Sequence, residues 1–261
     1  IGEALELGGE NPDEPQRPLP VPTGPAAIEL DDVGFRYGDE WVLRGASAQI
    51  APGAFVVLVG PNGSGKSTLA QIIAGLIEPD EGAVRINGRP LREIAPEERH
   101  RLVLYTPQNI GLFNRTLREN ALYPPTRASE AELAALLADW GFYDSGRPID
   151  LDLVVGEHGA RLSGGQTQKL ELARLLGVTA PVVILDETTS ALDQTSEVRA
   201  IRTLRERYRG SSTLILITHR VGMVLQADTV LFLEQFSLCT GSHEALSRAC
   251  PLYASFCGGL I

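Results

Sequence analysis

A glycine-rich loop between an apolar run and a helical segment is the feature that most constrains this chain. Residues 55–59 read FVVLV, which is typical of a buried strand, and residues 67–76 have the spacing of a helix. The intervening residues 60–67 read GPNGSGKS. Glycines at this spacing let backbone N–H groups converge on phosphate oxygens, and the following helix adds the positive end of its dipole. The lysine then reaches the β- and γ-phosphates, and the serine hydroxyl binds Mg²⁺. We therefore predict a nucleotide-binding loop that consists of Gly60, Pro61, Asn62, Gly63, Ser64, Gly65, Lys66, Ser67 and Thr68.

Two acidic residues follow a second apolar run. Residues 182–185 read VVIL, and Asp186 and Glu187 come directly after them. A carboxylate at the C-terminal end of a strand can hold the Mg²⁺ that bridges the phosphates, and a second one can position and polarise the attacking water. An Asp-Glu pair after a strand is by itself more often the start of a loop, but the phosphate-binding loop upstream favours the catalytic interpretation.

The sequence LSGGQ at residues 162–166 points to a family. With the phosphate-binding loop before it and the Asp-Glu pair after it, the chain resembles the ATP-binding cassette (ABC) ATPases, whose signature motif is LSGGQ. A Gly-Gly turn that caps the following helix explains the segment locally but not the whole set of motifs. The resemblance covers residues 26–256 and implies that ATP and Mg²⁺ are bound. It also implies that the signature of one cassette closes over the ATP of another through Ser163, Gly164, Gly165 and Gln166.

Other positions take their roles from the same resemblance. Tyr37 resembles the aromatic residue that stacks on adenine, and Gln108 resembles the glutamine that contacts Mg²⁺ and water and senses the transmembrane partner. Asp193, in the segment SALD, resembles the D-loop residue at the nucleotide, and His219 resembles the switch histidine that contacts the γ-phosphate. The resemblance implies as catalytic residues Glu187, His219 and Gln108, and as metal ligands Ser67, Gln108 and Asp186.

Two segments favour the exporter branch of this family. Residues 112–120 (LFNRTLREN) resemble the exporter pattern after the glutamine, and residues 156–161 (GEHGAR) resemble the stretch before the exporter signature. In exporters these segments meet the coupling helices of the membrane domain. The resemblance therefore implies an ATP-hydrolysing motor domain that dimerises with a second ABC ATPase domain, identical or different. It would work with an exporter's transmembrane domain at the cytoplasmic face of the cell membrane.

The order of apolar runs and helical segments predicts the fold. Apolar runs separated by helices are typical of buried parallel strands, and four short strands are expected earlier, at residues 28–30, 34–37, 42–43 and 46–50. Residues 129–140 have helical spacing and a capping box. With the resemblance, we predict an α/β fold: a P-loop NTPase core with a mostly parallel sheet, an N-terminal antiparallel β-subdomain and an inserted α-helical subdomain. The ATPase domain is expected at residues 26–257, with the helical subdomain at about 109–170.

The beginning of the chain differs in composition from the rest. Residues 1–25 contain six of the 17 prolines among acids and glycines, which predicts an acidic linker. Residues 1–32 carry eight acids and one arginine, a balance of −7 out of the net −10, and no segment has a basic excess for a nucleic-acid backbone. No apolar run approaches the ~20 residues that span a bilayer. The chain does not begin with Met, so we expect a fragment whose membrane domain is fused upstream.

Two other functions are compatible with an ABC cassette. One is a soluble ABC ATPase that acts on chromatin, ribosomes or cluster assembly, but no second cassette, long heptad region or basic excess supports it. The other is a cassette that binds ATP without turnover. Such a cassette typically lacks the second acid or the switch histidine, whereas Glu187 and His219 are both present. We therefore favour ATP hydrolysis that drives export.

The chain departs from the family pattern in two places. Family members usually have a glycine-containing hairpin after the switch strand, whereas residues 231–241 (LFLEQFSLCTG) lack an obvious tight turn. Thr167 stands where many relatives carry Arg.

The three cysteines, Cys239, Cys250 and Cys257, are an odd number and form no CxxC pair. This pattern predicts buried, inert thiols in a reducing compartment. The histidines that match no motif position are expected to be solvated; they are His100, His158 and His243.

Overall fold

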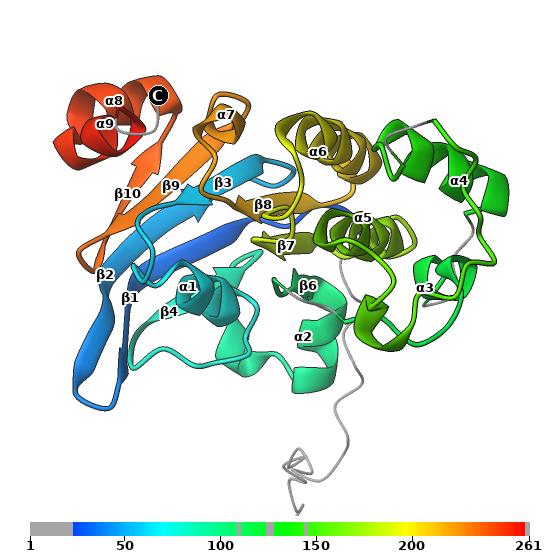
Figure 1. Ribbon diagram of the computed structural model, residues 1–261. Coiled ribbons are helices and arrows are strands. Elements are labelled where there is room, and N and C mark those ends of the chain that lie inside the picture. Colours follow the sequence, from blue (N-terminus) through cyan, green and yellow to red (C-terminus); the bar gives the residue numbers. More distant parts are fainter. Residues whose placement is uncertain (1–22, 109–110, 124–127, 144–145, 259–261) are drawn as a thin grey trace, which may run out of the picture.

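The computed structural model describes residues 23–108, 111–123, 128–143 and 146–258. Most of the predicted acidic linker, residues 1–22, lies outside the described residues. The described chain forms two sheets, with helices on both sides of the larger one (Figure 1). An antiparallel N-terminal sheet beside a mostly parallel sheet confirms the predicted α/β fold.

The smaller sheet is antiparallel and is built from the N-terminal part of the chain. In the order β2-β1-β4-β5, its strands are β1 (Ile28–Tyr37), β2 (Glu40–Ile50), β4 (Glu81–Ile86) and β5 (Arg89–Pro90). The expectation of four short strands is wrong, because the chain forms two long strands. Register shifts between Leu30 and Val33 and between Val33 and Phe35 bend the β1–β2 ladder without ending it.

The larger sheet has the order β10-β9-β3-β8-β7-β6; its edge pair β9–β10 is antiparallel and the other pairs are parallel. Its strands are β3 (Phe55–Val59), β6 (Val103–Thr106), β7 (Val182–Asp186), β8 (Thr213–Ile217), β9 (Thr229–Glu234) and β10 (Ser237–Gly241). Every residue of β3, β7 and β8 is buried, as is usual for parallel strands covered on both faces. Successive residues of β3 enter two cores, with Val57 and Val59 in one and Val56 and Leu58 in the other.

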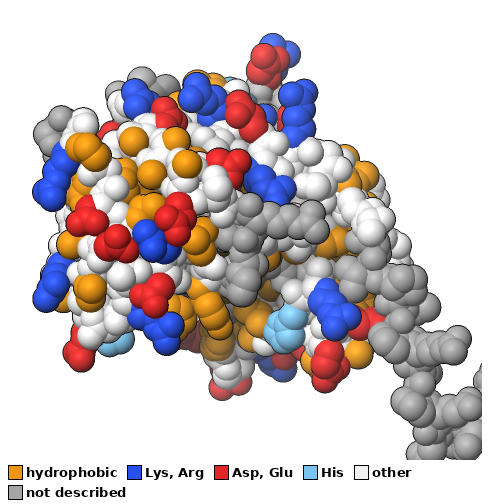
Figure 2. Space-filling model, turned by 90° about the vertical axis from the view of Figure 1, so that its right-hand side faces the viewer, with side chains coloured by type: hydrophobic (Ala, Val, Ile, Leu, Met, Phe, Trp, Pro, Cys, Tyr) orange, Lys and Arg blue, Asp and Glu red, His pale blue; other side chains and the backbone are white. Residues whose placement is uncertain are grey.

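Helices cover both faces of this sheet (Figure 1). On the side of the molecule that Figure 2 shows, acidic and basic side chains are interspersed with hydrophobic ones. The helices α1 (Lys66–Ile73) and α2 (Pro96–Leu102) lie on one face, and α6 (Gln194–Tyr208) lies on the other. Between β6 and β7 the chain forms α3 (Leu117–Ala121), α4 (Glu130–Asp139), the 3₁₀ turn η2 (Glu157–Gly159) and α5 (Gly164–Leu175); another 3₁₀ turn, η1 (Leu91–Glu93), precedes α2. The capping box predicted for α4 is present, since Ser129 Oγ accepts from the Glu132 N–H at 3.2 Å and the Glu132 carboxylate accepts from the Ser129 N–H at 2.7 Å.

A buried arginine ties the exporter-like segment, residues 112–120, to α5. Arg174 donates to the carbonyl oxygens of Asn120 at 2.9 Å and Gly111 at 2.8 Å, and to Asn120 Oδ1 at 2.6 Å. Burial lowers the pKa of the Arg174 guanidinium, and Glu171 opposes this shift. Because one side chain satisfies three acceptors, the segment is held in a single position on α5.

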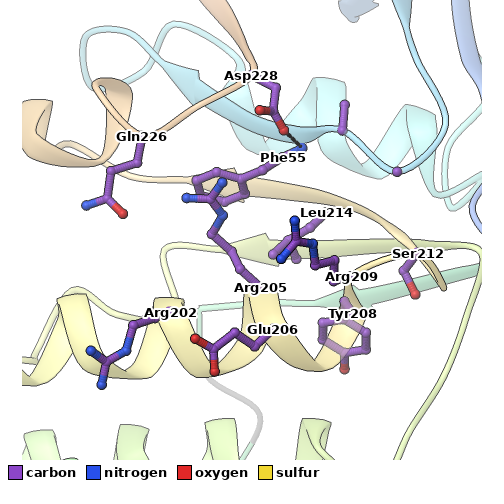
Figure 3. A pocket seen from close by; sticks show the side chains of 12 residues that line it. Phe55, Arg202, Arg205, Glu206, Tyr208, Arg209, Ser212, Leu214, Gln226 and Asp228 are labelled. Carbon is purple, nitrogen blue, oxygen red and sulfur yellow. Dashed lines mark hydrogen bonds between the residues drawn. The ribbon is translucent and has the colours of Figure 1, made fainter.

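The amino ends of β3 and β8 lie at the end of the sheet opposite to the glycine-rich loop, which follows the carboxyl end of β3. A hollow of about 400 Å³ opens there (Figure 3). The start of β3 is fixed because Asp228 Oδ2 accepts from the Phe55 N–H at 2.8 Å. The Arg205 guanidinium of α6 lies over the Phe55 ring, 4.4 Å from its centroid. The Arg205 contact holds α6 against the sheet, and none of the predicted site residues lines this hollow.

The segment after β9 contains a tight turn, which corrects the sequence interpretation. The strands pair up to Glu234 and Ser237, so Gln235 and Phe236 form the turn. Both residues have positive φ, 49° and 68°. Two-residue hairpin turns of this kind usually carry glycine or asparagine, which explains why the sequence pattern shows no turn here. The Phe236 side chain is 48% exposed, so packing offsets little of the backbone strain.

Replacing Phe236 by Gly should stabilise the protein by about 1 kcal/mol, because glycine adopts positive φ without a clash between Cβ and the backbone. Urea unfolding should show a higher midpoint for Phe236→Gly than for the parent. Phe236→Ala is the matched control, since it removes the ring but keeps the Cβ. If Phe236→Gly unfolds at the same or a lower urea concentration than the parent, the turn is not strained.

The C-terminal helices pack on the β9–β10 hairpin. They follow α7 (Val221–Val224) and are α8 (His243–Ala249) and α9 (Pro251–Gly258). His243 corrects the expectation of a solvated side chain, because it is half-buried and its Nδ1 lies 2.7 Å from the Tyr253 hydroxyl. His100 and His158 are exposed, as expected. Across the described ranges, no helix combines the length and the apolar character that crossing a bilayer requires.

Candidate nucleotide site

The glycine-rich loop connects the C-terminal end of β3 to the start of α1. Gly65 is the N-cap of α1 with φ 98°, and a Cβ there would lie 2.6 Å from Val42 Cγ1. A Cβ on Gly60 would collide with the Leu233 carbonyl oxygen. Both positions therefore need glycine, the first for its backbone conformation and the second for a close approach to β9. The loop can curve tightly enough to direct its N–H groups into one concavity.

Lys66 folds back over this loop. Its ammonium donates to the carbonyl oxygens of Gly60 at 3.0 Å and Pro61 at 2.8 Å, and the residue is 5% exposed. Burial lowers the pKa of Lys66, and the nearby carboxylates of Glu187 and Asp186 oppose that shift. A buried cation held by carbonyl oxygens is well placed for the negative charge of a phosphate.

Asp186 joins the strand β7 to the glycine-rich loop. Ser67 Oγ donates to Asp186 Oδ1 at 3.2 Å, and the Tyr105 hydroxyl donates to Asp186 Oδ2 at 2.7 Å. Burial and the Asp186 carboxylate raise the pKa of Tyr105, so the phenol stays protonated and donates. The Ser67 hydroxyl and the Asp186 carboxylate are two adjacent oxygen ligands, the kind that Mg²⁺ prefers, and so the residues fit this ion.

Glu187 lies between two polar side chains. His219 Nε2 is 3.1 Å from Glu187 Oε1, and Gln108 Nε2 donates to Glu187 Oε2 at 3.4 Å. The backbone of Glu187 has φ 51°, an uncommon conformation for this residue type, and its N–H donates to the Ile217 carbonyl oxygen at 3.1 Å. The turn at the end of β7 thus holds the Glu187 carboxylate within reach of His219, which follows β8, and of Gln108, which follows β6.

A hollow of about 510 Å³ brings part of this set together, without Gln108 and Asp186. Its walls carry the Tyr37 ring, the glycine-rich loop, Glu187 and His219. The Tyr37 side chain is 57% exposed and meets the Phe35 ring edge-on at 4.9 Å between centroids, so the ring can offer a face to a flat ligand. The hollow is lined by Tyr37, Val42, Asn62, Gly63, Gly65, Lys66, Ser67, Thr68, Glu187 and His219.

The signature residues lie elsewhere. Ser163 caps α5, where its Oγ accepts from the Gln166 N–H at 3.2 Å and its own N–H donates to Gln166 Oε1 at 2.9 Å. Gly164 and Gly165 form the first turn of that helix, and Ser163 and Gly164 are exposed. Asp193 caps α6, and hydrogen bonds from Ser196 lower its pKa. None of these five residues lines the hollow at the glycine-rich loop, so a single chain does not bring the two sets together.

Sequence reasoning missed two residues that position others. One is Tyr105, whose signal is its place on β6, where it pairs with Ile184 two residues before Asp186. The other is Gln168, which connects α5 to the predicted D-loop. Its Nε2 donates to Ser190 Oγ at 3.0 Å, and its Oε1 accepts from the Ala191 N–H at 2.7 Å. The position on β6 is thus a signal for Tyr105, whereas no local pattern distinguishes Gln168.

Comparison with known proteins decides the family. The family described as ABC transporter matches residues 43–190, more than half of the chain. The chain belongs to the ABC transporter family. Its described residues form an ATP-binding ATPase domain of this family, with the predicted fold.

Named relatives of this ABC domain are exporters and flippases. An ATP-dependent lipid A-core flippase of Alkalilimnicola ehrlichii is 39% identical over 98% of the chain and 44% of the relative. The flippase of Chromobacterium violaceum is 39% identical over 93% of the chain and 42% of the relative. A solved bacterial Atm1-family ABC exporter with ATP bound is 34% identical, with a TM-score of 0.82 over 97% of the chain and 45% of that protein. The chain spans less than half the length of these relatives.

Proposed function

We propose that this ABC domain is the motor of an exporter and that it hydrolyses Mg-ATP in the hollow beside the glycine-rich loop. The observation that carries the proposal is the position of Glu187, whose carboxylate lies between His219 and Gln108 at the mouth of the Lys66 loop. A carboxylate held there by two side chains can accept a hydrogen bond from a water molecule and orient it toward a γ-phosphate.

The other side chains have complementary roles in this proposal. The loop amides and Lys66 bind the β- and γ-phosphates, and His219 holds Glu187 and reaches the γ-phosphate. Ser67 and Asp186, with Gln108, would hold Mg²⁺, which when bound neutralises charge on the phosphate oxygens. Tyr105 positions Asp186 through its 2.7 Å hydrogen bond. Tyr37 stacks on the adenine ring.

A second cassette completes the site in this proposal. Ser163 and Gly164 are exposed at the start of α5, away from the hollow of their own chain. The N–H groups of Gly164 and Gly165 and the Ser163 hydroxyl are suited to an anion, because the start of a helix carries partial positive charge. We infer that Ser163 and Gly164, with Gly165, Gln166 and Asp193, contact the ATP held by another ABC ATPase domain, identical or different.

The partner outside the chain is a membrane domain. The relatives are more than twice as long as the chain, which supports a fused transmembrane part and a place at the cytoplasmic face of the cell membrane. The exporter-like segment held by Arg174 carries the exposed rings of Phe113 and, nearby, Tyr123, which lie 5.2 Å apart. Two exposed aromatic rings on a fixed segment suit a docking contact with such a domain.

A chimera tests the export proposal. The flippase of Alkalilimnicola ehrlichii, with its own cassette replaced by this chain, should keep ATP-dependent transport in vesicles. Lys66→Ala in the chimera should abolish it, whereas Arg101→Gln, which removes an exposed charge on α2, should not. A chain that hydrolyses ATP alone while an assembled chimera never transports would argue for the soluble ATPase instead.

Tyr37→Ala should weaken ATP binding by ~1–3 kcal/mol, because a base loses its stacking surface. Tyr37→Trp should keep the affinity. Calorimetric titration with a non-hydrolysable ATP analogue measures both. If the ring only packs in the small sheet, both variants should instead unfold at lower temperature, and equal affinity of Tyr37→Ala and the parent would refute stacking.

A further inference from the structure

Two thiols from different elements meet in the C-terminal part of the described chain. Cys239 lies in β10, and Cys250 follows the last residue of α8. Their Sγ atoms are 3.4 Å apart, and both thiols are free. Cys239 is only half-buried, which corrects the expectation that all three thiols are buried. We propose that Cys239 and Cys250 are a redox modification site, which forms a reversible intramolecular disulfide bond with a peroxide as oxidant.

The backbone around the two cysteines allows the bond to form. A disulfide has an S–S distance of about 2.0 Å, so the sulfur atoms need to approach by only about 1.4 Å. Cys250 has the extended conformation φ −119°, ψ 98° between α8 and α9. Its N–H donates to the Leu246 carbonyl oxygen at 2.9 Å and its carbonyl oxygen accepts from the Ala254 N–H at 3.0 Å, so both helices hold the backbone and the sulfur approaches by rotation of the Cys250 side chain. Cys239 sits opposite Phe232 in the β9–β10 pair, which keeps its side of the contact rigid.

The third cysteine provides an internal comparison. Cys257 is buried in α9, one helical turn after Tyr253, and burial and this thiol raise the pKa of the Tyr253 hydroxyl. Tyr253 is in turn held by His243 Nδ1 at 2.7 Å and by the Phe232 ring at 5.3 Å between centroids. Cys257 therefore lies beside a phenol, whereas Cys239 and Cys250 meet sulfur to sulfur, and the structure assigns the pair to these two.

The reaction with hydrogen peroxide balances in two steps. Cys239 is the less buried of the two, so its sulfur attacks a peroxide oxygen first; the O–O bond breaks, one water leaves, and a sulfenic acid remains. The Cys250 sulfur then attacks the sulfenic sulfur, the S–O bond breaks, and a second water leaves. Burial raises the pKa of the Cys239 thiol to about 11, so little thiolate is present at neutral pH and the first step is slow.

The bond would join the β9–β10 hairpin to the C-terminal helices. It closes the loop from residue 239 to residue 250 and so restricts the unfolded chain. The same hairpin carries the Gln235–Phe236 turn, which lines a hollow beside Asn62 and Gly63 of the glycine-rich loop. Oxidation would thus fasten the strand pair that borders the nucleotide site to α8.

Peptide mapping tests the proposal on the full chain. The protein is incubated with hydrogen peroxide, unfolded, alkylated at its remaining thiols and cleaved after arginine. Cys239 falls on the peptide of residues 221–248, and both Cys250 and Cys257 fall on that of residues 249–261. The parent and Cys257→Ser should yield these two peptides joined by a disulfide that a thiol reductant reverses, within a chain of monomeric mass. Cys250→Ser should yield no joined peptides.

Thermal unfolding gives a second readout. Oxidised parent and oxidised Cys257→Ser should melt roughly 5 °C above their reduced forms, and Cys250→Ser should show no such rise. Three alkylated thiols after peroxide treatment, a link that survives in Cys250→Ser, oxidation of Cys239 to sulfinic acid without a link, or a link between two chains would each overturn the proposal.

Discussion

Glu187→Gln is expected to hydrolyse ATP ~100-fold more slowly than the parent, or slower still. The amide has the size of the carboxylate but cannot accept a proton or polarise a water in the same way. The amide oxygen can accept the hydrogen bond that Gln108 donates, and the amide nitrogen can donate to His219 Nε2 when the imidazole carries its proton on Nδ1, so the local structure should survive. The loss then reports on chemistry rather than on folding.

ATP binding by Glu187→Gln should be unchanged, because Lys66, Ser67 and the loop amides are untouched. Mg-ATP should now hold two chains together in a stable dimer, which size-exclusion chromatography with light scattering can detect. Glu206→Gln, which changes an exposed carboxylate on α6, is the matched control and should hydrolyse ATP at the parent rate. A steady-state rate of Glu187→Gln close to that of the parent would remove Glu187 from the catalytic role.

Mixing two inactive variants should restore ATP hydrolysis. Lys66→Ala disables the phosphate loop and Ser163→Arg disables the signature. In a mixed dimer whose sites are assembled between chains, one site combines both defects and the other combines an intact loop with an intact signature. At equal amounts half of the dimers are mixed and each has one of its two sites intact, so roughly a quarter of the parent rate is expected if the sites act independently. A site assembled within one chain predicts no recovery at any ratio.

Two controls make the mixing experiment decisive. Ser163 also caps α5, and losing the cap costs about 1 kcal/mol, so circular dichroism must show that Ser163→Arg is folded. Cross-linking must show that mixed dimers form at the protein concentration used. Mixed dimers that stay at the background rate of the single variants mean that the site is not shared between chains or that both sites must fire together.

Contiguous sequence signals account for the parts of the fold that were predicted. The run at residues 55–59, the glycine-rich loop and the following helix are neighbours in the chain, so their pattern specifies a strand, a tight turn and a helix locally. The capping box at Ser129 and Glu132 is equally local. Two local signals predicted the wrong structure because strand pairing outweighed them. Register shifts kept β1 and β2 continuous where short strands were expected. The pairing of β9 with β10 placed Phe236 in a turn position that glycine normally occupies.

The sequence by itself determined which chemical groups are available at the proposed site, because the loop, the Asp-Glu pair and the signature each present them in adjacent residues. Only the tertiary structure decided which of them meet. Tyr105 reaches Asp186 and His219 reaches Glu187 because β6, β7 and β8 are neighbours in the sheet, although they are far apart in the chain. The same holds for the contact of Cys239 with Cys250, which depends on α8 packing against β10. Strand order and helix packing come from burying apolar faces of the whole chain at once, and no short segment contains that information.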